Sequence, residues 1–397
     1  MFKTSLPILI SGAGIAGLAF ARQLKKAKIP FTLIEKRSQL TAEGTGIALP
    51  ANAMRALRFL GLASAIERHA HPVDTIIYTD AAGATLSKAS LLEAPLNTDQ
   101  FVALHRHQLH EILYEGLNEP IHFNTTIKHI SQTQNGVLVT FNEPTLKQTA
   151  FSAVIGADGV HSTVRQLAFT QQPLADLGVS IWRWISPYPT HDLQPTYLLG
   201  GQDVFMAYPM SKDTVYCYAH ALDPDNLHTQ ASDHQSTLTQ QFGHYGSIAK
   251  TLLGRLPKNS EIIPGRLRSV AQPVFTSGRA ALIGDASHAC SPMLQQGAAC
   301  ALEDAIILST LLQHCSIEKA FSQYAQLRSE PINWITTASD GPMKLLINLD
   351  QQKLPALYQK IRENGPLNVQ GWRQLLARNP LQELSAHMTR KKEQPIF

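Results

Sequence analysis

The sequence has few cysteines and no long apolar runs, and each shortage excludes a class of protein. Its four cysteines form no C-x-x-C pair, and nothing before the first strand resembles a signal peptide, so we expect free thiols in a reducing cytoplasm. No stretch approaches the ~20 apolar residues that a membrane span needs. We therefore expect no integral membrane protein, while peripheral contact through the C-terminal helices stays open.

Charge is sparse as well. Only 16% of the 397 residues are charged, and Lys and Arg are scattered without a basic run at a net charge of +4, so nucleic acid is not an expected partner. No paired carboxylates, Ser/His/Asp set or metal-ligand spacing is evident, and the pairs His69/His71 and His105/His107 lack a third ligand. We predict no metal. The length allows two domains or one large domain with an insertion.

The stretch from Leu6 to Arg37 predicts a dinucleotide-binding unit. An apolar strand over 8–10, a glycine turn, a helix over 15–28 and a second strand over 31–34 follow in order. The turn is Gly12-Ala13-Gly14-Ile15-Ala16-Gly17, a G-x-G-x-x-G. Its first glycine allows the tight turn, the second lets the backbone approach a diphosphate, and the third lets helix and strand pack closely. The helix N-terminus offers free N–H groups to that diphosphate.

Glu35 ends the second strand at the spacing of an acid that binds a ribose 2′-OH. A 2′-phosphate would sit badly beside this carboxylate, so the resident dinucleotide should be FAD or NAD rather than NADP. The alternative is a glycine turn without a ligand.

The rest of the chain alternates predicted helices and strands, except for one segment in which several strands follow one another. Strands over 179–185, 197–199, 204–208 and 215–220, followed by a polar helical stretch over 233–253, predict an inserted, mainly antiparallel sheet. Elsewhere we expect strands over 101–104, 121–130, 137–141, 150–155 and 279–283, a hairpin from 73–80 and 84–88, helices over 51–60, 106–117, 297–314 and 317–337, and a helical tail from Pro342.

Three separated motifs carry a family resemblance. They are the glycine turn, then Gly156-Ala157-Asp158-Gly159 followed by Ser162 and Arg165, then Gly284-Asp285-Ala286. Together they resemble the class A flavoprotein monooxygenases, the para-hydroxybenzoate hydroxylase-like family, over roughly residues 6–330. The middle sheet matches only in pattern and the tail hardly at all.

The resemblance implies bound FAD. Asp285, at the carboxyl end of a strand, would accept hydrogen bonds from the ribitol hydroxyls, with a helix N-cap as its alternative role. Asp158 would contact FAD and shape the transient nicotinamide site. Arg106 would approach the diphosphate and Arg37 the adenine, each with a surface role as the alternative. The expected cofactor-binding residues are Gly12, Gly14, Ala16, Gly17, Glu35, Lys36, Arg37, Gly46, Arg106, Ile127, Asp158, Asp285, Pro292, Gly297 and Ala298.

The flavin ring is expected between two segments. Gly44 to Ile47 resembles the family's loop along the isoalloxazine, and the helix from Gly297 would direct its N-terminus at the pyrimidine ring. The family shows a proline and a glycine-rich step before this helix, whereas this chain has Pro292 but is one glycine short. The side chains of Gln295 and Gln296 are therefore expected to crowd or hydrogen-bond the flavin edge.

A single G-x-G-x-x-G and the lack of C-x-x-C argue against a flavin disulfide reductase, so NADH or NADPH must visit rather than reside. The resemblance implies that the nicotinamide reduces FAD, that O₂ adds at flavin C4a, and that the hydroperoxide hydroxylates a planar aromatic or heteroaromatic molecule. Alternatives are another FAD-linked oxidase, a flavin redox sensor without turnover, and a halogenase. The halogenase motif W-x-W-x-I-P is only partly matched by 182–187, because Ser186 replaces its isoleucine.

Substrate contacts are expected on the inserted sheet, where alternate side chains share a face. Arg183 and Tyr216 are predicted to orient the substrate, Arg183 by holding a carboxylate or phenolate. The predicted substrate-binding residues are Trp182, Trp184, Tyr208, Tyr218, His220 and Met293. The alternative for the aromatic residues is to cover a sheet or a domain interface, and His288 is expected to be structural.

These expectations define an α/β protein with a Rossmann-like FAD-binding domain of the GxGxxG type, an inserted β-sheet domain and C-terminal helices. The FAD-binding domain should comprise 1–72, 101–170 and 274–340, the substrate domain 73–100 and 171–273, and the tail 341–397. The expected partners are a small aromatic substrate and O₂, in a monomer or homodimer.

Overall fold

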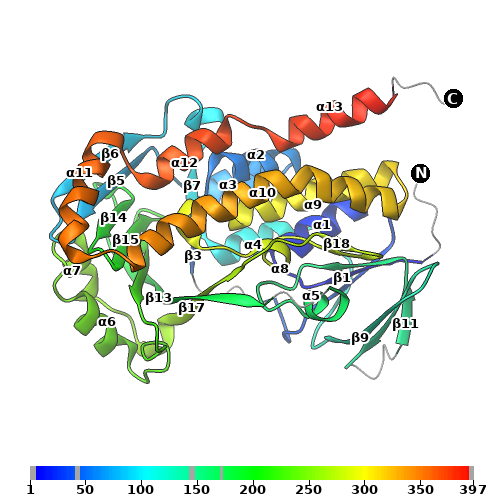
Figure 1. The fold of residues 1–397 in the computed structure, drawn as a ribbon, viewed down its shortest axis with the longest axis horizontal. Helices are drawn as coiled ribbons and strands as arrows, with labels where there is room; N and C mark the ends of the chain where they lie inside the picture. Colours follow the sequence, from blue (N-terminus) through cyan, green and yellow to red (C-terminus); the bar gives the residue numbers. More distant parts are fainter. Residues whose placement is uncertain (1–5, 41–44, 143–147, 170–172, 393–397) are drawn as a thin grey trace.

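The computed structural model describes residues 6–40, 45–142, 148–169 and 173–392, with side chains up to residue 386. Two large sheets lie side by side, and long helices run along them (Figure 1). This arrangement confirms the mixed α/β class.

The first large sheet begins with the predicted strand, glycine turn, helix and strand. β1 (Ile8–Ser11) lies between β12 and β2 (Phe31–Ile34), parallel to both, and α1 (Ile15–Lys26) connects β1 to β2. The strand order is β18-β19-β12-β1-β2-β8, and only the edge pair β18–β19 is antiparallel. The remaining strands are β8 (Ile121–His122), β12 (Ala153–Gly156), β18 (Thr276–Ser277) and β19 (Ala280–Leu282). The carboxyl ends of β1, β2, β12 and β19 therefore meet at one edge, where such sheets bind ligands.

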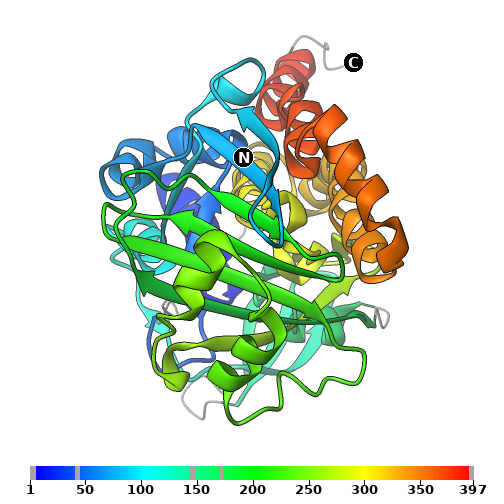
Figure 2. The ribbon, with the colours of Figure 1, turned by 90° about the vertical axis from the view of Figure 1, so that its left-hand side faces the viewer.

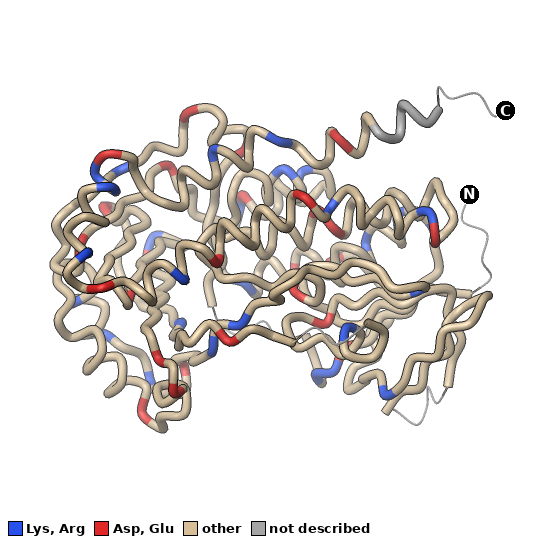
Figure 3. Tube along the Cα trace, in the orientation of Figure 1, with Lys and Arg blue, Asp and Glu red and all other residues tan. Residues whose placement is uncertain are grey.

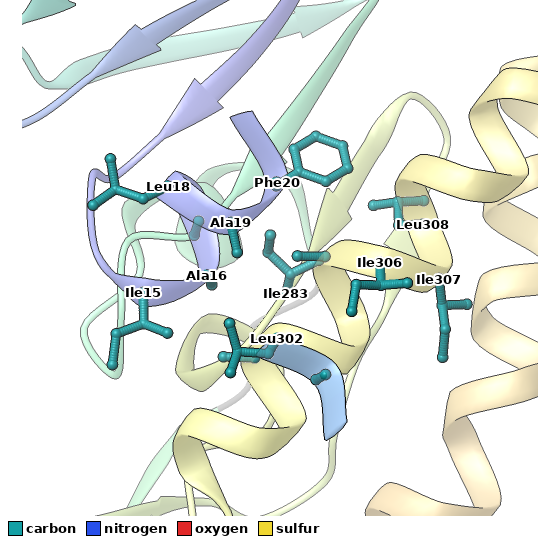
Figure 4. Close-up of a cluster of buried hydrophobic side chains, with 14 of the residues drawn as sticks. Ile15, Ala16, Leu18, Ala19, Phe20, Ile283, Leu302, Ile306, Ile307 and Leu308 are labelled. Carbon is teal, nitrogen blue, oxygen red and sulfur yellow. The ribbon is translucent and has the colours of Figure 1, made fainter. Parts of the chain in front are cut away.

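The core of this unit lies between α1 and α9 (Gly297–His314), whose bounds agree with the predicted helix. Figure 4 shows Ala19 and Phe20 of α1 on the side of Leu302 and Ile306 of α9, with Ile283 between them. All five side chains are fully buried. This packing fixes the N-termini of both helices relative to the sheet edge.

α10 (Ile317–Ile347) is longer than predicted. It continues past Pro331 and Pro342, although each proline removes one backbone donor. Ile332, Ile335, Met343 and Leu346 are buried along it, and this apolar face outweighs the local cost. The expected helix end at 337 is therefore wrong, and the expected boundary at 341 falls inside a continuous helix.

The second large sheet has the order β17-β13-β16-β15-β14-β5-β6, and only the β14–β5 pair is parallel. Its strands are β5 (Thr75–Asp80), β6 (Thr85–Ser90), β13 (Leu174–Pro187), β14 (Thr196–Leu199), β15 (Asp203–Pro209), β16 (Thr214–Leu222) and β17 (Ile263–Val270). β17 was not predicted. The early hairpin β5–β6 thus joins strands from more than 100 residues further along the chain.

One face of this sheet is covered by α6 (His234–Phe242) and α7 (Ser247–Leu253), which lie in front of the strands in Figure 2. Trp182 and Trp184 pack on this covered face with Phe242, and both indoles are fully buried. The other face is turned toward the first sheet and the C-terminal helices.

Two predicted strands are each divided between sheets. The segment expected over 121–130 forms β8 and β9 (Ile127–Gln132), because the chain turns at Asn124, whose φ is 54°. The segment expected over 150–155 forms β11 (Gln148–Phe151) and β12. β9 and β11 flank β10 (Val137–Phe141) in a small antiparallel sheet. A second small sheet contains β3 (Gly46–Leu49), β7 (Val102–His105) and β4 (His71–Pro72).

The other helices are short, and α11 to α13 follow α10 along the upper edge of Figure 1. They are α2 (Ala51–Phe59), α3 (Ala63–His69), α4 (Arg106–Tyr114), α5 (Thr163–Ala168), α8 (Asp285–His288), α11 (Leu354–Asn364), α12 (Leu367–Leu376) and α13 (Pro380–Lys392), with 3₁₀ turns η1 (Leu96–Thr98), η2 (Asn259–Glu261), η3 (Pro292–Leu294) and η4 (Gln351–Lys353). Figure 3 shows acidic and basic residues interspersed along the trace. In the described part of the chain, no helix has both the length and the apolar character of a membrane span.

Candidate active site

Two cavities share walls at the carboxyl edge of the first sheet. The small cavity, of about 350 Å³, is lined by residues that include Gly12, Glu35, Arg37, Ile127 and Asp158. The large cavity, of about 520 Å³, continues from it to the uncovered face of the second sheet. Gly14, Arg106, Ala157, Gly159, Val160, His161 and Asp285 line both. The two cavities therefore form one groove.

The glycines of the turn have two functions: close packing of the backbone and space for a ligand. A Cβ at Gly12, whose φ is +105°, would lie 2.5 Å from the carbonyl oxygen of Ala157, and a Cβ at Gly17 would overlap the carbonyl oxygen of Gly12. A Cβ at Gly14 would have no neighbour within 4 Å among the described residues, and Gly14 lines the groove. Gly12 and Gly17 are thus needed for packing, and Gly14 leaves space for a ligand.

Glu35 is fixed beside this turn. Its Oε2 accepts from the backbone N–H of Ala13 at 2.9 Å, and its Oε1 accepts from that of Arg37 at 3.0 Å. The carboxylate lines the small cavity together with Lys36 and Arg37. The geometry suits an acceptor for a ribose hydroxyl with cationic side chains next to it.

Asp158 holds the start of α5. Its Oδ2 accepts from the backbone N–H groups of Thr163 (2.8 Å) and Val164 (3.1 Å), while its buried Oδ1 has no partner among the described residues. Burial raises the pKa of this carboxyl group. A buried acceptor without a donor in a groove wall is an expected feature of a ligand site.

Arg165 connects this segment to the third motif. Its guanidinium is 2% exposed and donates to the carbonyl oxygens of Val160 and Ala286, both at 2.6 Å. Arg165 is therefore not part of a surface ion pair. Arg106, by contrast, lies at the first position of α4 and lines both cavities, where its side chain can reach a diphosphate.

Asp285 stands where the cavities join. It follows β19 and Gly284, whose φ is +61°, and its exposed carboxylate faces both cavities. The N-terminal residues of α9, Gly297 and Ala298, line the large cavity with Pro292 and Met293. Ala16 and Gly46 line it as well. Gly44, the other end of the loop expected along the flavin, lies outside the described residues.

The loop before α9, residues 291–296, is held from three elements. The N–H of Ser291 donates to Asp340 Oδ1 of α10 at 2.7 Å. The indole Nε1–H of Trp372 on α12 donates to the carbonyl oxygen of Leu294 at 2.8 Å. The side chain of Gln296 pairs with Asn52 of α2 at 2.8 Å. The loop is therefore positioned by the C-terminal helices as well as by its own unit.

Gln295 adopts a left-handed backbone conformation, with φ 53° and ψ 33°, which a glycine would adopt at less cost. Its Nε2 donates to the hydroxyls of Tyr197 (2.7 Å) and Tyr208 (3.2 Å), and those hydroxyls lie 2.9 Å apart. Gln295 lines the large cavity, whereas Gln296 is 2% exposed and does not. The expectation that both side chains face the flavin edge is thus wrong for Gln296.

The face of the second sheet that is opposite α6 and α7 forms the far wall of the large cavity. Arg183, Tyr216, Tyr218 and His220 line it. Nε of Arg183, Oη of Tyr218 and both ring nitrogens of His220 are buried without a partner among the described residues. Burial lowers the pKa of His220 to about 4, so its imidazole is neutral near pH 7.

Three predicted substrate residues do not line this wall. Trp182 and Trp184 point to the opposite face, where α6 and α7 cover them, because strand alternation places them away from Arg183. The halogenase-like pair of tryptophans is therefore remote from the cavity. Tyr208 is fully buried behind Gln295 and reaches the cavity only through it. The large cavity is also lined by residues that the sequence pattern did not indicate, among them Tyr78, Tyr197, Met206, Leu267, Leu346 and Leu367.

A buried ionic network lies behind Asp285. Arg328 of α10 donates to Asp304 Oδ1 (2.6 Å) and Glu303 Oε2 (2.9 Å), and all three side chains are at most 4% exposed. Asp304 Oδ2 accepts from the backbone N–H of Gly284 (2.9 Å) and lies 2.7 Å from His288 Nε2. His288 is thus a buried member of this network outside the cavities, as expected for a structural histidine.

The groove fits FAD. The groove runs from Glu35, a suitable acceptor for a ribose hydroxyl, to a space beside α9 that could hold a ring system. Between them, Gly14 leaves room for a diphosphate. The N-termini of α1 and α9 face the groove. The unpartnered Oδ1 of Asp158 adds a free acceptor. Within the described residues, no cluster of His, Cys, Asp and Glu could hold a metal ion.

Comparisons with known proteins agree. Residues 5–326 match the family described as FAD binding domain, and the chain belongs to this family as a class A flavoprotein monooxygenase with FAD as its bound cofactor. The 2-heptyl-3-hydroxy-4(1H)-quinolone synthase of Pseudomonas aeruginosa is 31% identical over 342 residues, which cover 84% of this chain and 88% of that protein. Aurachin C monooxygenase/isomerase of Stigmatella aurantiaca is 24% identical over 83% of this chain and 87% of its own.

Among solved structures, Klebsiella pneumoniae HpxO complexed with FAD and uric acid aligns with a TM-score of 0.85 at 23% identity. The alignment covers 96% of this chain and 99% of that one, so the two share a fold.

Proposed function

We propose that this enzyme uses NADH or NADPH and O₂ to hydroxylate a planar heteroaromatic molecule in the large cavity. When bound, FAD would supply the redox chemistry, by accepting a hydride from the nicotinamide and then activating O₂. The protein supplies orientation and shields the reaction from water. The observation that carries the proposal is the set of unpartnered polar atoms on Arg183, Tyr218 and His220, all on the wall across from α9.

The roles of these side chains follow from their chemistry. Arg183 offers fixed N–H donors to a ring oxygen that carries negative charge, and the Tyr218 hydroxyl can donate to or accept from the same edge of the ring. His220, neutral near pH 7, can accept from a ring N–H. A 4-quinolone ring has both a carbonyl oxygen and an N–H, and the name of the Pseudomonas relative contains this ring. A 4-quinolone is therefore our first candidate substrate.

The test is oxidation of NADH and NADPH by the FAD-loaded protein, with and without 4-quinolones and phenols, together with mass spectrometry of the products. Stimulated oxidation with a product one oxygen atom heavier supports the proposal. Bound flavin without stimulated turnover across the panel favours a redox sensor, and a product without added oxygen favours an oxidase.

The Arg183→Gln variant tests the site itself. We expect its KM for the accepted ring to rise about tenfold or more, since a hydrogen bond to a charged group contributes about 1.5–3 kcal/mol. Arg362→Gln changes an exposed arginine on α11 and serves as the matched control. An unchanged KM in Arg183→Gln would remove this residue from the site.

We also infer a division of labour between the two large sheets. The Rossmann-like unit with the GxGxxG turn, from 1–72, 101–170 and 274–340, binds FAD, and the mainly antiparallel sheet from 73–100 and 171–273 binds the substrate. The joining of β5–β6 to the later strands supports this division. The four cysteines are free thiols in the structure, which is compatible with a cytoplasmic enzyme. It would act as a monomer or homodimer.

A further inference from the structure

The far wall of the large cavity has two ends of different chemistry. Direct cross-strand partners share a face of a sheet, so the pairing register orders the lining side chains in rows. From β13 to β5, one row is Arg183, Tyr218, Met206, Tyr197 and Tyr78, and from β13 to β14 the next is Ile181, His220, Val204 and Leu199. All nine line the cavity.

The polar atoms that lack partners lie at one end of these rows. They belong to Arg183, Tyr218 and His220, on β13 and β16. On β15 and β14 the rows continue with Met206, Val204 and Leu199, which are apolar.

The hydroxyl of Tyr197, further along its row, is already bonded to Tyr208 and Gln295. A polar group of a ligand would lose its hydration at this end without finding a free partner. A ligand that complements both ends of the wall therefore has a polar part at β13 and β16 and an apolar part at β15 and β14.

The C-terminal helices form the roof of the apolar end. Leu346 of α10 and Leu367 of α12 line the same cavity and pack in one cluster with Leu199 and Met206. Gln202 Nε2, in the turn between β14 and β15, donates to the carbonyl oxygen of Ile347 at 3.2 Å and fastens α10 to the sheet. From β16 to β5 the sheet extends by three strand spacings, about 14 Å.

We propose that this apolar arm, lined by Tyr197, Leu199, Val204, Met206, Leu346 and Leu367, binds an unbranched aliphatic chain of the substrate. The polar atoms of the ring bind Arg183, Tyr218 and His220, and the chain extends from the ring across β15 and β14 beneath α10. The position of the ring rests on the proposed function. The chemistry of the arm rests only on its lining.

The first test measures binding without turnover. The oxidised, FAD-loaded protein is titrated with 4-quinolones that carry methyl, propyl or heptyl at C2, and perturbation of the flavin absorbance gives the dissociation constants. We expect binding to tighten by about fourfold for each added methylene group that is buried. Equal affinity for the methyl and heptyl compounds would contradict the proposal that the chain binds in the arm.

A second series separates this inference from the ring proposal. Hexanoate, octanoate and decanoate carry an anionic head for Arg183 and a linear chain, but no ring to hydroxylate. Affinity that rises with their length supports the arm even if no quinolone binds. Affinity that is independent of length in both series overturns the arm, whether or not quinolones are hydroxylated.

A variant pair on α10 locates the chain. Leu346 is 1% exposed and lines the arm, whereas its neighbour Leu345 is 54% exposed. We expect Leu346→Phe to weaken heptyl-quinolone binding at least tenfold while methyl-quinolone binding changes less than twofold, because the larger ring shortens the arm. Leu345→Phe should leave both constants unchanged. Equal loss for both ligands in Leu346→Phe, or the same effect in Leu345→Phe, would contradict this location.

Discussion

Asp285 is one of seven residues that line both cavities, and its carboxylate is exposed at their junction. Replacing it by alanine would remove the acceptor that we propose for the ribitol hydroxyls. We expect Asp285→Ala to weaken FAD binding roughly ten- to a hundredfold, from the ~1.5–3 kcal/mol of a charged hydrogen bond. The ratio of flavin to protein absorbance after purification measures this loss. Asp225→Ala, in an exposed loop outside both cavities, is the control, and unchanged flavin content in Asp285→Ala would refute the assignment.

Gly14 tests the diphosphate position without disturbing the fold. Its Cβ direction is open, so Gly14→Val should fold and yet exclude FAD by filling the groove. Gly17→Ala gives a contrast, because its added Cβ overlaps the carbonyl oxygen of Gly12 and should lower the melting temperature. Flavin content and thermal unfolding of both variants separate the two effects. Full FAD occupancy in Gly14→Val would place the diphosphate elsewhere.

At the scale of elements, α12 holds the loop before α9, beside the proposed flavin site. Trp372→Phe removes the hydrogen bond to the carbonyl oxygen of Leu294 and keeps most of the aromatic packing against Phe101. We expect FAD to stay bound, stability to fall by about 1 kcal/mol, and a larger share of NAD(P)H oxidation to yield hydrogen peroxide instead of product. The ratio of product to NAD(P)H consumed measures this coupling.

Trp334→Phe on α10 makes the same substitution at a partly buried indole that donates no hydrogen bond to the loop within the described residues. It should leave the coupling ratio unchanged. If both variants keep full coupling, α12 has no role in positioning the loop.

Several strands also show what the local sequence pattern does not predict, namely which sheet a strand joins. The hairpin β5–β6 was predicted from its turn, but its position beside β14 depends on strands more than 100 residues away. The segments over 121–130 and 150–155 have continuous strand patterns, yet each is divided where the chain passes from one sheet to another. Strand propensity reports how well a residue fits a pleated surface and does not specify which sheet it joins.

For the whole molecule, the network of Arg328, Asp304 and Glu303 joins α9 and α10 to the Gly284 turn. Burial alone would raise the pKa of Asp304, but Arg328 and His288, with the Gly284 N–H, lower it to about 2. This folded-state pKa lies below the unfolded value of about 3.9, so the stabilisation is fully present above about pH 4 and is lost as the pH falls toward 2. Urea unfolding of the FAD-loaded protein at several pH values in this range should show that loss.

Asp304→Asn should lower the free energy of unfolding at pH 7 by about 3–5 kcal/mol, because it leaves the buried Arg328 without one of its two carboxylate partners. It should also flatten the acid dependence. Glu330→Gln, which breaks an exposed ion pair with Arg378, should change stability by less than about 1 kcal/mol. If the free energy of unfolding fell by a similar amount in both variants, the buried ion pair would contribute no more to stability than the exposed one.

The sequence by itself indicated FAD as the bound cofactor, because the motifs that point to it are local. The glycine spacing, the helix after it and Glu35 lie within thirty residues, and the three motifs each end a strand of one parallel sheet. Only the tertiary structure decided the substrate wall. Alternation along β13 defines two faces but does not say which one α6 and α7 cover, so the tryptophans and Arg183 could be assigned only once those helices were placed. The arm likewise exists because α10 and α12 close over strands that are distant in the sequence.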